Sequence, residues 1–244
     1  MPLDEWLVNS VRGQYQALAP IYDVLYTTER EHLTEDRVLQ RVFRKAITPG
    51  LAVLDIGCGT GGFIDLTGHP EDRYIGVDLC PEMVRRAKRK HPGHHFYVED
   101  ICQFSRFNAD KQFDRIVSLY GPANYIGLMN MADVIAAHLK PGGWAFVMAY
   151  LGDYLPSYYE GRRPGFLQRV NENEMTYVFS LRCQGLLCAS DVLKCREYGF
   201  ALRSSWLVRH APLGLGVFRQ WARMHSSPGR GVKYSICLAY RSNP

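Results

Sequence analysis

The sequence predicts an α/β protein with a doubly wound, mostly parallel sheet that is covered by helices on both faces. Between residues 51 and 151, short apolar runs rich in β-branched residues alternate with helical stretches, which is the pattern of βαβ units. A cluster of glycines directly follows the first apolar run, where the chain must turn sharply from strand to helix. The chain has 244 residues, of which 47% are apolar, so one large core in a single domain with insertions is expected.

Five strands and three helices are expected in this central stretch. The strands are predicted at residues 52–56, 73–78, 95–99, 113–119 and 144–150, and the helices at 62–67, 81–90 and 124–139. Pro81 suits the first turn of the second helix, because its missing amide would have no intrahelical partner there. Pro141, Gly142 and Gly143 predict a turn before the fifth strand.

The flanking segments are predicted from their periodicity. Residues 1–49 carry apolar side chains at helical spacing, so they are expected to form helices that act either as packing elements or as a lid. After the central stretch, residues 189–198 are predicted as a helix that ends at Gly199. Strands near 201–208 and 233–240 would then complete the sheet.

Composition favours a soluble, cytoplasmic protein without a metal. The apolar run at 144–151 is far shorter than the ~20 residues of a membrane-spanning helix, and the N-terminus lacks a basic and then apolar signal. Seven scattered cysteines without a Cys-x-x-Cys pair predict reduced thiols rather than a disulfide framework or a zinc site. The net charge of +5 is modest, and the basic run at 85–90 is interpreted as a solvated helix face rather than a nucleic-acid surface.

The glycine turn after the first predicted strand indicates a nucleotide-like cofactor. The spacing of Gly57, Gly59 and Gly62 satisfies the dinucleotide fingerprint, which leaves a nicotinamide or flavin cofactor open. However, Asp55 stands two residues before the first glycine and gives the pattern Asp-x-Gly-x-Gly-x-Gly, which ends at Gly61. A carboxylate at this position suits the ammonium of S-adenosylmethionine, whereas it would repel a pyrophosphate.

Further candidate contacts follow the second and third predicted strands. Asp78 is expected to accept hydrogen bonds from ribose hydroxyls, a role that both kinds of cofactor allow. Asp100 can accept a hydrogen bond from an adenine amino group, while Ile101 packs on the ring and Met83 covers its other face. The alternatives are that Asp100 caps a loop and that Met83 belongs to the core.

Together these residues resemble the class I, Rossmann-like, S-adenosylmethionine-dependent methyltransferase superfamily of the small-molecule type. Asp55 to Gly61 match its first motif, Asp78 the acidic residue that ends its second strand, and Asp100 the acid after its third strand. Residues 139–143 are similar to the segment before its fifth strand, so the resemblance covers roughly residues 50–151.

The resemblance implies the cofactor, the domain organisation and further site residues. It implies S-adenosyl-L-methionine as cofactor, S-adenosyl-L-homocysteine as product, and a seven-stranded sheet whose last strand is antiparallel. Residues 1–49 would be an N-terminal helical lid and 50–244 the methyltransferase domain, with a substrate-side insertion at about 152–190. Residues 15–23 are similar to a lid segment of small-molecule members, which adds Tyr22 to the cofactor candidates, and Leu119 at the end of the fourth strand completes them.

Methyl transfer from a sulfonium mainly needs a well-placed nucleophile and the exclusion of water. An alkylammonium or phenol, which titrates near pH ~10, would also need help to lose its proton. Ligands of open α/β sheets bind at the carboxyl ends of the strands, so His210 is the candidate base, and Tyr120 can orient a nucleophile. The Asn/Asp-Pro-Pro-Tyr/Phe motif of methyltransferases acting on exocyclic base amines is missing at 120–125.

The sequence therefore predicts a methyltransferase acting on nitrogen or oxygen of a small aromatic or amine acceptor. The aromatic residues between 150 and 206 could line such a pocket, although an aromatic-rich cover packed over the sheet is the commoner explanation. An RNA or protein methyltransferase, a non-catalytic S-adenosylmethionine-binding protein and a nicotinamide oxidoreductase stay open as alternatives. Neither a membrane partner nor a nucleic acid is expected, and the oligomeric state stays open.

Overall fold

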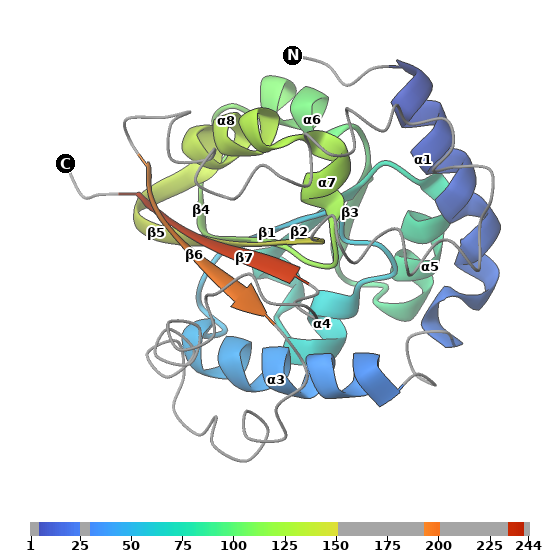
Figure 1. Cartoon of the computed structure of the whole chain (residues 1–244), viewed down its shortest axis with the longest axis horizontal. Helices are drawn as coiled ribbons and strands as arrows, with labels where there is room; N and C mark the ends of the chain where they lie inside the picture. Colours follow the sequence, from blue (N-terminus) through green and yellow to red (C-terminus); the bar gives the residue numbers. More distant parts are fainter. Residues whose placement is uncertain (1–4, 25–29, 151–192, 201–233, 242–244) are drawn as a thin grey trace.

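A computed structural model describes residues 5–24, 30–150, 193–200 and 234–241 (Figure 1). The helices are α1 (Glu5–Leu18), the 3-10 turn η1 (Ala19–Ile21), α3 (Arg30–Ala46), α4 (Gly62–Thr67), the 3-10 turn η2 (Glu71–Arg73), α5 (Pro81–Lys90), α6 (Ile101–Phe107), α7 (Pro122–Ile126) and α8 (Leu128–His138). The strands are β1 (Val53–Ile56), β2 (Tyr74–Asp78), β3 (His95–Val98), β4 (Phe113–Ser118), β5 (Leu139–Tyr150), β6 (Leu193–Phe200) and β7 (Tyr234–Arg241).

One sheet organises the described chain. Its strands lie in the order β3-β2-β1-β4-β5-β7-β6, and the first five pair in parallel. The last two strands pair antiparallel, β7 with β5 and β6 with β7. The order reverses between β1 and β4, which is the switch point where open α/β sheets bind ligands at the carboxyl ends of their strands.

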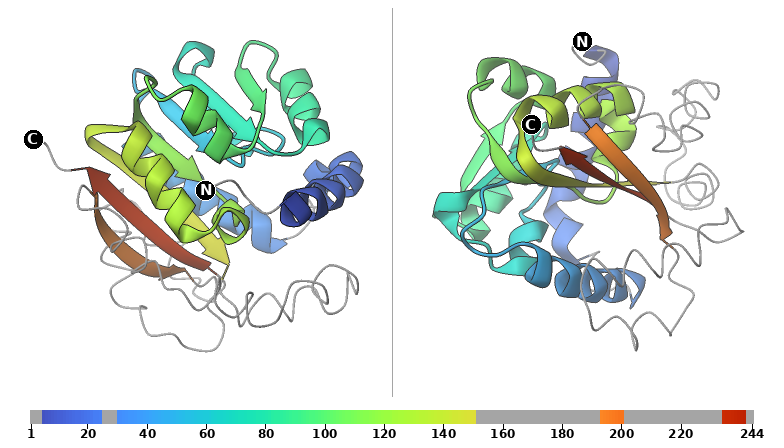
Figure 2. Two further views of the ribbon diagram at one scale, coloured as in Figure 1. Left: turned by 90° about the horizontal axis from the view of Figure 1, so that it is seen from above. Right: turned by 90° about the vertical axis from the view of Figure 1, so that its left-hand side faces the viewer.

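Helices cover both faces of the sheet (Figure 2), and the side chains of the strands β1, β2, β4 and β5 alternate between two apolar clusters. Val53, Val117 and Phe146 point to the face that is covered by α3, α4 and α5. Leu54 and Ile116 point to the opposite face, under α6, α7 and α8. The predicted α/β class with a parallel five-stranded sheet is thus confirmed, and the burial of both faces explains why these strands are continuous apolar runs.

The described N-terminal residues are helical: α1 and η1 lie beside α5, whereas α3 packs on α4 (Figure 1). Arg86 of α5 donates to the carbonyl of Pro20 at 2.8 Å, and Arg12 of α1 donates to the carbonyl of Leu79 at 3.4 Å. The prediction of helices within residues 1–49 is therefore right for the described part, and these contacts hold the segment against the ends of the strands.

Two predictions in the second half of the central stretch need correction. The single helix expected at 124–139 is two helices, because Gly127 has a φ of +81° and ends α7 before α8 begins. In addition, α6 was not predicted, although Asp100 caps it: its side chain accepts from the backbone amide of Cys102 at 2.8 Å. Asp100 followed by Ile101 and Phe104 on one face was the signal for this short helix.

The predictions for the C-terminal part of the chain differ more strongly from the structure. A helix was expected at 189–198, but residues 193–200 form β6, which pairs along its length with β7. Pairing with a neighbouring strand outweighs weak local helix propensity, and this cannot be seen from a single segment. The strand expected near 201–208 lies outside the described residues, as does the insertion at 152–190, while the strand expected at 233–240 is β7.

The fifth strand begins earlier than expected. β5 runs from Leu139 to Tyr150, and Pro141 to Gly143 lie within it instead of in a separate turn. Its register with β4 shifts between Phe113 and Arg115, so the Pro-Gly-Gly segment forms an irregularity inside the strand. The strain that such a segment introduces is thus accommodated by a bulge-like register shift.

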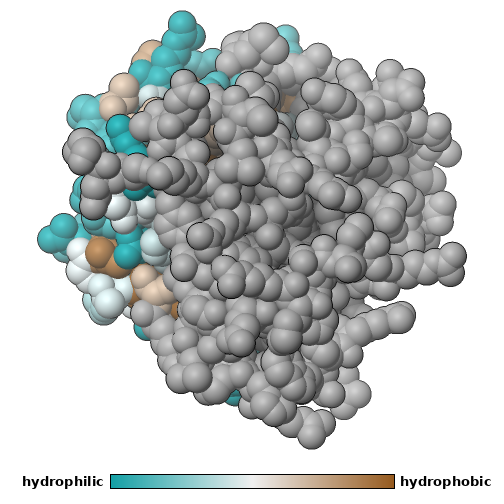
Figure 3. All heavy atoms as spheres, turned by 60° about the vertical axis from the view of Figure 1, so that its left-hand side comes forward, coloured by the Kyte–Doolittle hydropathy of each residue, from teal (hydrophilic) through white to brown (hydrophobic). Residues whose placement is uncertain are grey.

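In the view of Figure 3, the coloured part of the surface, which belongs to the described residues, is mostly hydrophilic, with small hydrophobic areas between polar residues. Among the described helices, none combines the length and the apolar character that crossing a membrane requires.

Candidate functional site

The candidate site forms where β1, β2, β3 and β4 end. The turn after β1 is held by the amides of Gly57 and Cys58, which donate to the carbonyl of Val77 at 2.8 and 3.2 Å. Gly57 has a φ of +72°, and a Cβ atom there would overlap the ring of Pro122. Glycine is therefore required at Gly57 both by its backbone conformation and by the close approach of α7.

Two adjoining cavities lie at this edge. The first has an apolar wall from Val8, Val11, Ile101 and Ile126, and Asp78, Glu99 and Asp100 provide its carboxylates. The second lies on the side of α3 and α4 and is lined by polar groups, chiefly Asp23, Asp36, Asp55, Thr60, Asp65 and Lys90. Tyr22, Gly57, Leu119 and Tyr120 line both. A ligand that fills both cavities must therefore pass these four residues.

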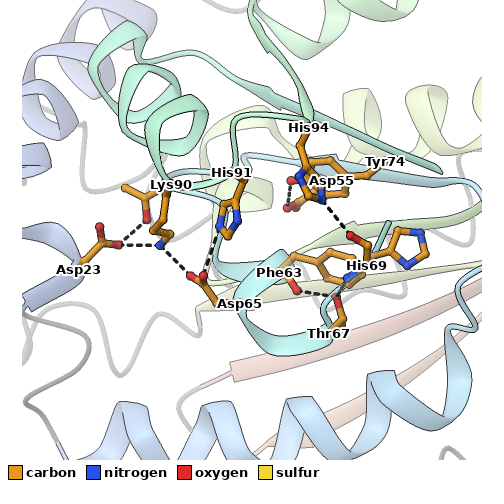
Figure 4. Close-up of polar contacts among 11 residues, drawn as sticks. Asp23, Asp55, Phe63, Asp65, Thr67, His69, Tyr74, Lys90, His91 and His94 are labelled. Carbon is orange, nitrogen blue, oxygen red and sulfur yellow. Dashed lines mark hydrogen bonds and ion pairs between the residues drawn. The ribbon is translucent and has the colours of Figure 1, made fainter. Parts of the chain in front are cut away.

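Asp55 is a buried carboxyl in the wall of the second cavity. Its side chain is 2% exposed, and the hydroxyl of Tyr74 donates to it at 2.8 Å (Figure 4). Burial raises the pKa of Asp55 to about 7; the hydrogen bond from Tyr74 lowers it and the charge of Asp78 raises it further. A carboxyl whose described partner is a neutral phenol suits a positively charged ligand group, because that charge would restore the ionised form.

Asp78 ends β2 and lies beside the glycine turn. Its two carboxylate oxygens accept from the backbone amides of Gly59 and Cys80 at 2.9 and 2.8 Å. Burial raises its pKa, and these two hydrogen bonds act in the opposite direction. Each carboxylate oxygen can accept more than one hydrogen bond, so Asp78 can fix the turn and still accept from a ligand in the first cavity.

Of the three residues expected to contact the adenine ring, two line the first cavity and one does not. Asp100 and Ile101 line the cavity, and Asp100 also caps α6, so the two interpretations of this residue hold at once. Met83 does not belong to the lining of either cavity; it is buried with Ala19 and Cys80 in a small apolar cluster. Its described surroundings are those of a core residue.

Tyr120 follows β4 in a strained conformation. Its φ is +58°, which is rare for an aromatic residue, and its hydroxyl donates to Asp36 of α3 at 2.5 Å. The next amide, Gly121, donates to the carbonyl of Met148 at 3.1 Å. Unusual backbone held by neighbouring elements is frequent at functional sites, and here it directs the phenol to the boundary of the two cavities.

A polar chain connects the N-terminal segment to the glycine turn and to α5 (Figure 4). Thr60 donates to Asp23 at 2.6 Å, and Lys90 contacts Asp23 at 3.3 Å and Asp65 at 2.7 Å. His91 approaches Asp65 at 3.2 Å. We call Asp23, Thr60, Lys90 and Asp65 the clasp, since they join three segments that are far apart in the sequence.

The other candidates are placed as follows. Gly59 and Gly61 both have positive φ values in the turn, and Gly59 donates its amide to Asp78. His210 lies outside the described residues. His138 is buried, and its ring nitrogens lie 2.8 Å from the carbonyl of Lys111 and 2.8 Å from the hydroxyl of Ser105, so it is packed away from both cavities.

Several lining residues were not found by sequence reasoning. Asp36 and Lys90 lie on helices whose other polar residues look equivalent in sequence, and Thr60 was taken only as part of the turn. Val8 and Val11 reach the first cavity because α1 packs beside α5. Only Thr60, inside the motif itself, carried a signal that could have been used. No group of three or more potential metal ligands occurs within the described ranges.

The strand order, the acidic residue before a Gly-x-Gly-x-Gly turn, and the acidic residues at the ends of β2 and β3 are similar to those of class I, Rossmann-like, S-adenosylmethionine-dependent methyltransferase domains. In agreement, residues 53–143 match the family described as Methyltransferase domain.

Individual relatives are similar to this chain over only part of their length. The chain is 31% identical to the uncharacterised protein MJ1252 of Methanocaldococcus jannaschii over 59% of this chain and 53% of that protein. It is 28% identical to a demethylmenaquinone methyltransferase of Chlorobaculum tepidum over 57% of this chain and 59% of the relative. The chain thus spans about half the length of the curated relatives it matches.

A similar fold occurs among solved structures. The plantazolicin methyltransferase BpumL, in complex with S-adenosylhomocysteine and a monoazolic substrate analogue, has a TM-score of 0.56 and 14% identity, over 97% of this chain and 99% of that one. At this identity the likeness concerns the fold.

Proposed function

We propose that this chain binds S-adenosylmethionine and transfers its methyl group to nitrogen or oxygen of a small-molecule acceptor. The observation that carries the proposal is Asp55, a buried carboxyl with a neutral partner, in the wall of a cavity directly behind the glycine turn. A nicotinamide cofactor would bring a pyrophosphate to this turn, and the carboxylate would repel it. The charge of Asp55 thus favours the ammonium of the methionine moiety.

The described residues fit the two ends of the cofactor. In this proposal the adenosine occupies the first cavity, where the apolar wall receives the base and Asp78 accepts from the ribose hydroxyls. Asp100 accepts from the adenine amino group, and the methionine moiety enters the second cavity towards Asp55. The bound cofactor supplies an activated methyl group on a positively charged sulfur.

The protein's own contribution is to position the ligand and to exclude water. The N-terminal segment closes the first cavity with Val8, Val11 and Tyr15, and the clasp holds it against the glycine turn. We therefore assign residues 1–49 the role of a lid. Positioning of this kind supplies much of the rate enhancement in reactions that need little proton transfer.

A small acceptor is supported by the name of one relative and by the missing base-amine motif. The Chlorobaculum tepidum relative is named for a small-molecule acceptor, and residues 120–125 lack the motif typical of enzymes that methylate exocyclic base amines. His210 stays the proposed base and Tyr120 the proposed orienting residue. The alternatives are an RNA or protein methyltransferase and a cofactor-binding protein without catalysis.

Two measurements test the proposal. S-adenosylhomocysteine should raise the thermal midpoint of the protein, while NAD and NADP should leave it unchanged, since a ligand that binds the folded state stabilises it. Methyl-labelled cofactor should then label a small-molecule extract and leave bulk RNA and protein unlabelled. Stabilisation by NAD alone would contradict the cofactor assignment, and label in RNA or protein would contradict the acceptor class.

A further inference from the structure

Asp36 and Tyr120 form a polar pair at the boundary of the two cavities. Asp36 comes from α3 and Tyr120 follows β4, 84 positions away in the sequence, and the phenol donates a hydrogen bond to the carboxylate. Asp36 lines the second cavity, whereas Tyr120 lines both. Their contact therefore joins the covering helix to the place that a ligand spanning both cavities must pass.

The direction of this hydrogen bond restricts what the pair can recognise. Because the hydroxyl hydrogen of Tyr120 points to Asp36, its oxygen presents lone pairs to other neighbours. The phenol oxygen therefore accepts hydrogen bonds, and the carboxylate behind it adds negative charge. A group that carries N–H donors and positive charge is complementary to both.

The negative charge of Asp36 also favours methylation of nitrogen acceptors over methylation of phenols. A phenol must approach its phenolate form to act as a nucleophile, and a nearby carboxylate raises its pKa by like-charge repulsion. The same carboxylate favours the protonated form of an amine, which must first give its proton to water. During the transfer itself, however, the charge on an amine changes in the opposite direction to that on a phenolate. Its nitrogen lone pair forms the new C–N bond, the C–S bond breaks with its electron pair left on sulfur, and the positive charge passes to nitrogen before a proton leaves to water. A carboxylate stabilises that charge.

We propose that Asp36 and Tyr120 form an acceptor-side subsite that takes an amine, and that Asp36 is the residue that selects nitrogen over oxygen. This inference rests on the proposed function and makes it narrower. Tyr120 contacts the acceptor amine directly, while Asp36 acts through the phenol as a positioning residue.

Sinefungin tests the subsite without knowledge of the natural acceptor. In this analogue of S-adenosylmethionine, an amine-bearing carbon replaces the methylated sulfur, so that a cationic amine stands where the methyl group would be. S-adenosylhomocysteine, which has a neutral thioether at that position, is the matched ligand. Calorimetric Kd values for both ligands should be measured with the wild-type chain, Asp36→Asn, Asp36→Glu and Tyr120→Phe. Asp72→Asn is the control, because Asp72 is an exposed residue that pairs with Arg73.

The wild-type chain should bind sinefungin more tightly than S-adenosylhomocysteine. In Asp36→Asn the ratio of the two Kd values should move about tenfold towards S-adenosylhomocysteine. Asp36→Glu should keep part of the preference and Asp72→Asn all of it. A general loss of structure would weaken both ligands together, so the ratio separates recognition from folding.

Each further outcome is decisive. If S-adenosylhomocysteine binds normally and the preference is the same in Asp36→Asn and the wild type, the subsite is wrong while the proposed function stands. If the wild-type chain binds neither ligand, both proposals are wrong. If Asp36→Asn binds neither ligand, Tyr120→Phe decides in its place, and an unchanged preference there contradicts the subsite.

Discussion

The hydroxyl of Tyr74 donates a hydrogen bond of 2.8 Å to the carboxyl group of Asp55 inside the sheet, and this contact links β2 to β1 behind the glycine turn (Figure 4). Tyr74 is 1% exposed, and burial raises its pKa well above its usual value. The phenol therefore stays a proton donor at every pH at which the protein is studied. The ionisation of this pair depends on Asp55.

Cofactor affinity should increase with pH. The pKa of Asp55 is about 7, so its ionised form, which attracts the ligand ammonium, grows between pH 6 and 8. The Kd of S-adenosylhomocysteine should fall up to about tenfold over this interval, a limit set by the increase in ionised carboxyl. Calorimetry at pH 6, 7 and 8 measures this change. Asp55→Asn should bind more weakly and lose most of the dependence; an equal dependence in the variant would exclude Asp55.

Ionisation of Asp55 should lower the stability of the folded protein, so stability should fall with rising pH while cofactor affinity increases. Its pKa in the folded state, about 7, lies above the reference value of 3.8, so between these values the folded state binds more protons than the unfolded state. The stability that Asp55 contributes is complete below pH 3.8 and is lost as pH rises to about 7. Urea unfolding of the wild type and Asp55→Asn at pH 5 and 8 should show the larger decrease in the wild type. A larger decrease in the variant would contradict the shift.

Tyr74→Phe should shift the midpoint of the pH dependence of cofactor binding to a higher pH. The hydrogen bond from Tyr74 lowers the pKa of Asp55, so its removal leaves a higher pKa and an unsatisfied buried carboxyl. We expect a loss of about 1–3 kcal/mol of unfolding free energy at pH 8. The midpoint of the binding curve should also rise. Tyr97→Phe, which removes a hydroxyl from a side chain that is 40% exposed, is the control and should change neither quantity.

Gly57→Ala should be more harmful than Gly59→Ala. Both residues have positive φ values, so each substitution should cost about 1–2 kcal/mol for the left-handed backbone alone. The Cβ at Gly57 would also overlap Pro122, whereas the space around Gly59 is open. Unfolding experiments and S-adenosylhomocysteine titrations should show the larger loss of stability and affinity at Gly57. Equal effects would mean that the approach of Pro122 is unimportant.

Opening the clasp should speed ligand release. Asp23→Ala removes the acceptor of the buried Thr60 hydroxyl and one partner of Lys90. The dissociation rate of S-adenosylhomocysteine should rise about two- to tenfold, as expected for one hydrogen bond. Stopped-flow displacement gives the rate. Asp72→Ala removes an exposed ion pair and should leave it unchanged. An unaltered rate in Asp23→Ala would show that the clasp does not restrain the lid.

His210→Ala should abolish most turnover while the affinity for S-adenosylhomocysteine stays the same. The reason is that a base acting on the acceptor does not contact the cofactor. Turnover is followed by label transfer into the small-molecule extract, and affinity by calorimetry. Turnover at the wild-type rate would remove His210 from the mechanism.

The parts of the fold that could be predicted are those in which a local pattern meets a strong steric rule. The central strands of the parallel sheet are largely apolar because both of their faces are buried, and the glycine turn needs residues without a Cβ. The position of β6 could not be predicted, because it depends on pairing with β7. The break at Gly127 and the cap at Asp100 had local signals that the periodicity of the longer segments obscured.

The central sheet, the turn and the acidic residues around it can be predicted from the order of residues alone, because spacing along one chain fixes which strand end each residue occupies. The contacts of Asp36 with Tyr120, of Lys90 with Asp23 and of Tyr74 with Asp55 cannot be predicted in this way. The first two contacts join segments more than 60 residues apart, and all three depend on how helices and strands pack. Which polar groups share the second cavity, and therefore which acceptor we propose, follows from this packing in three dimensions.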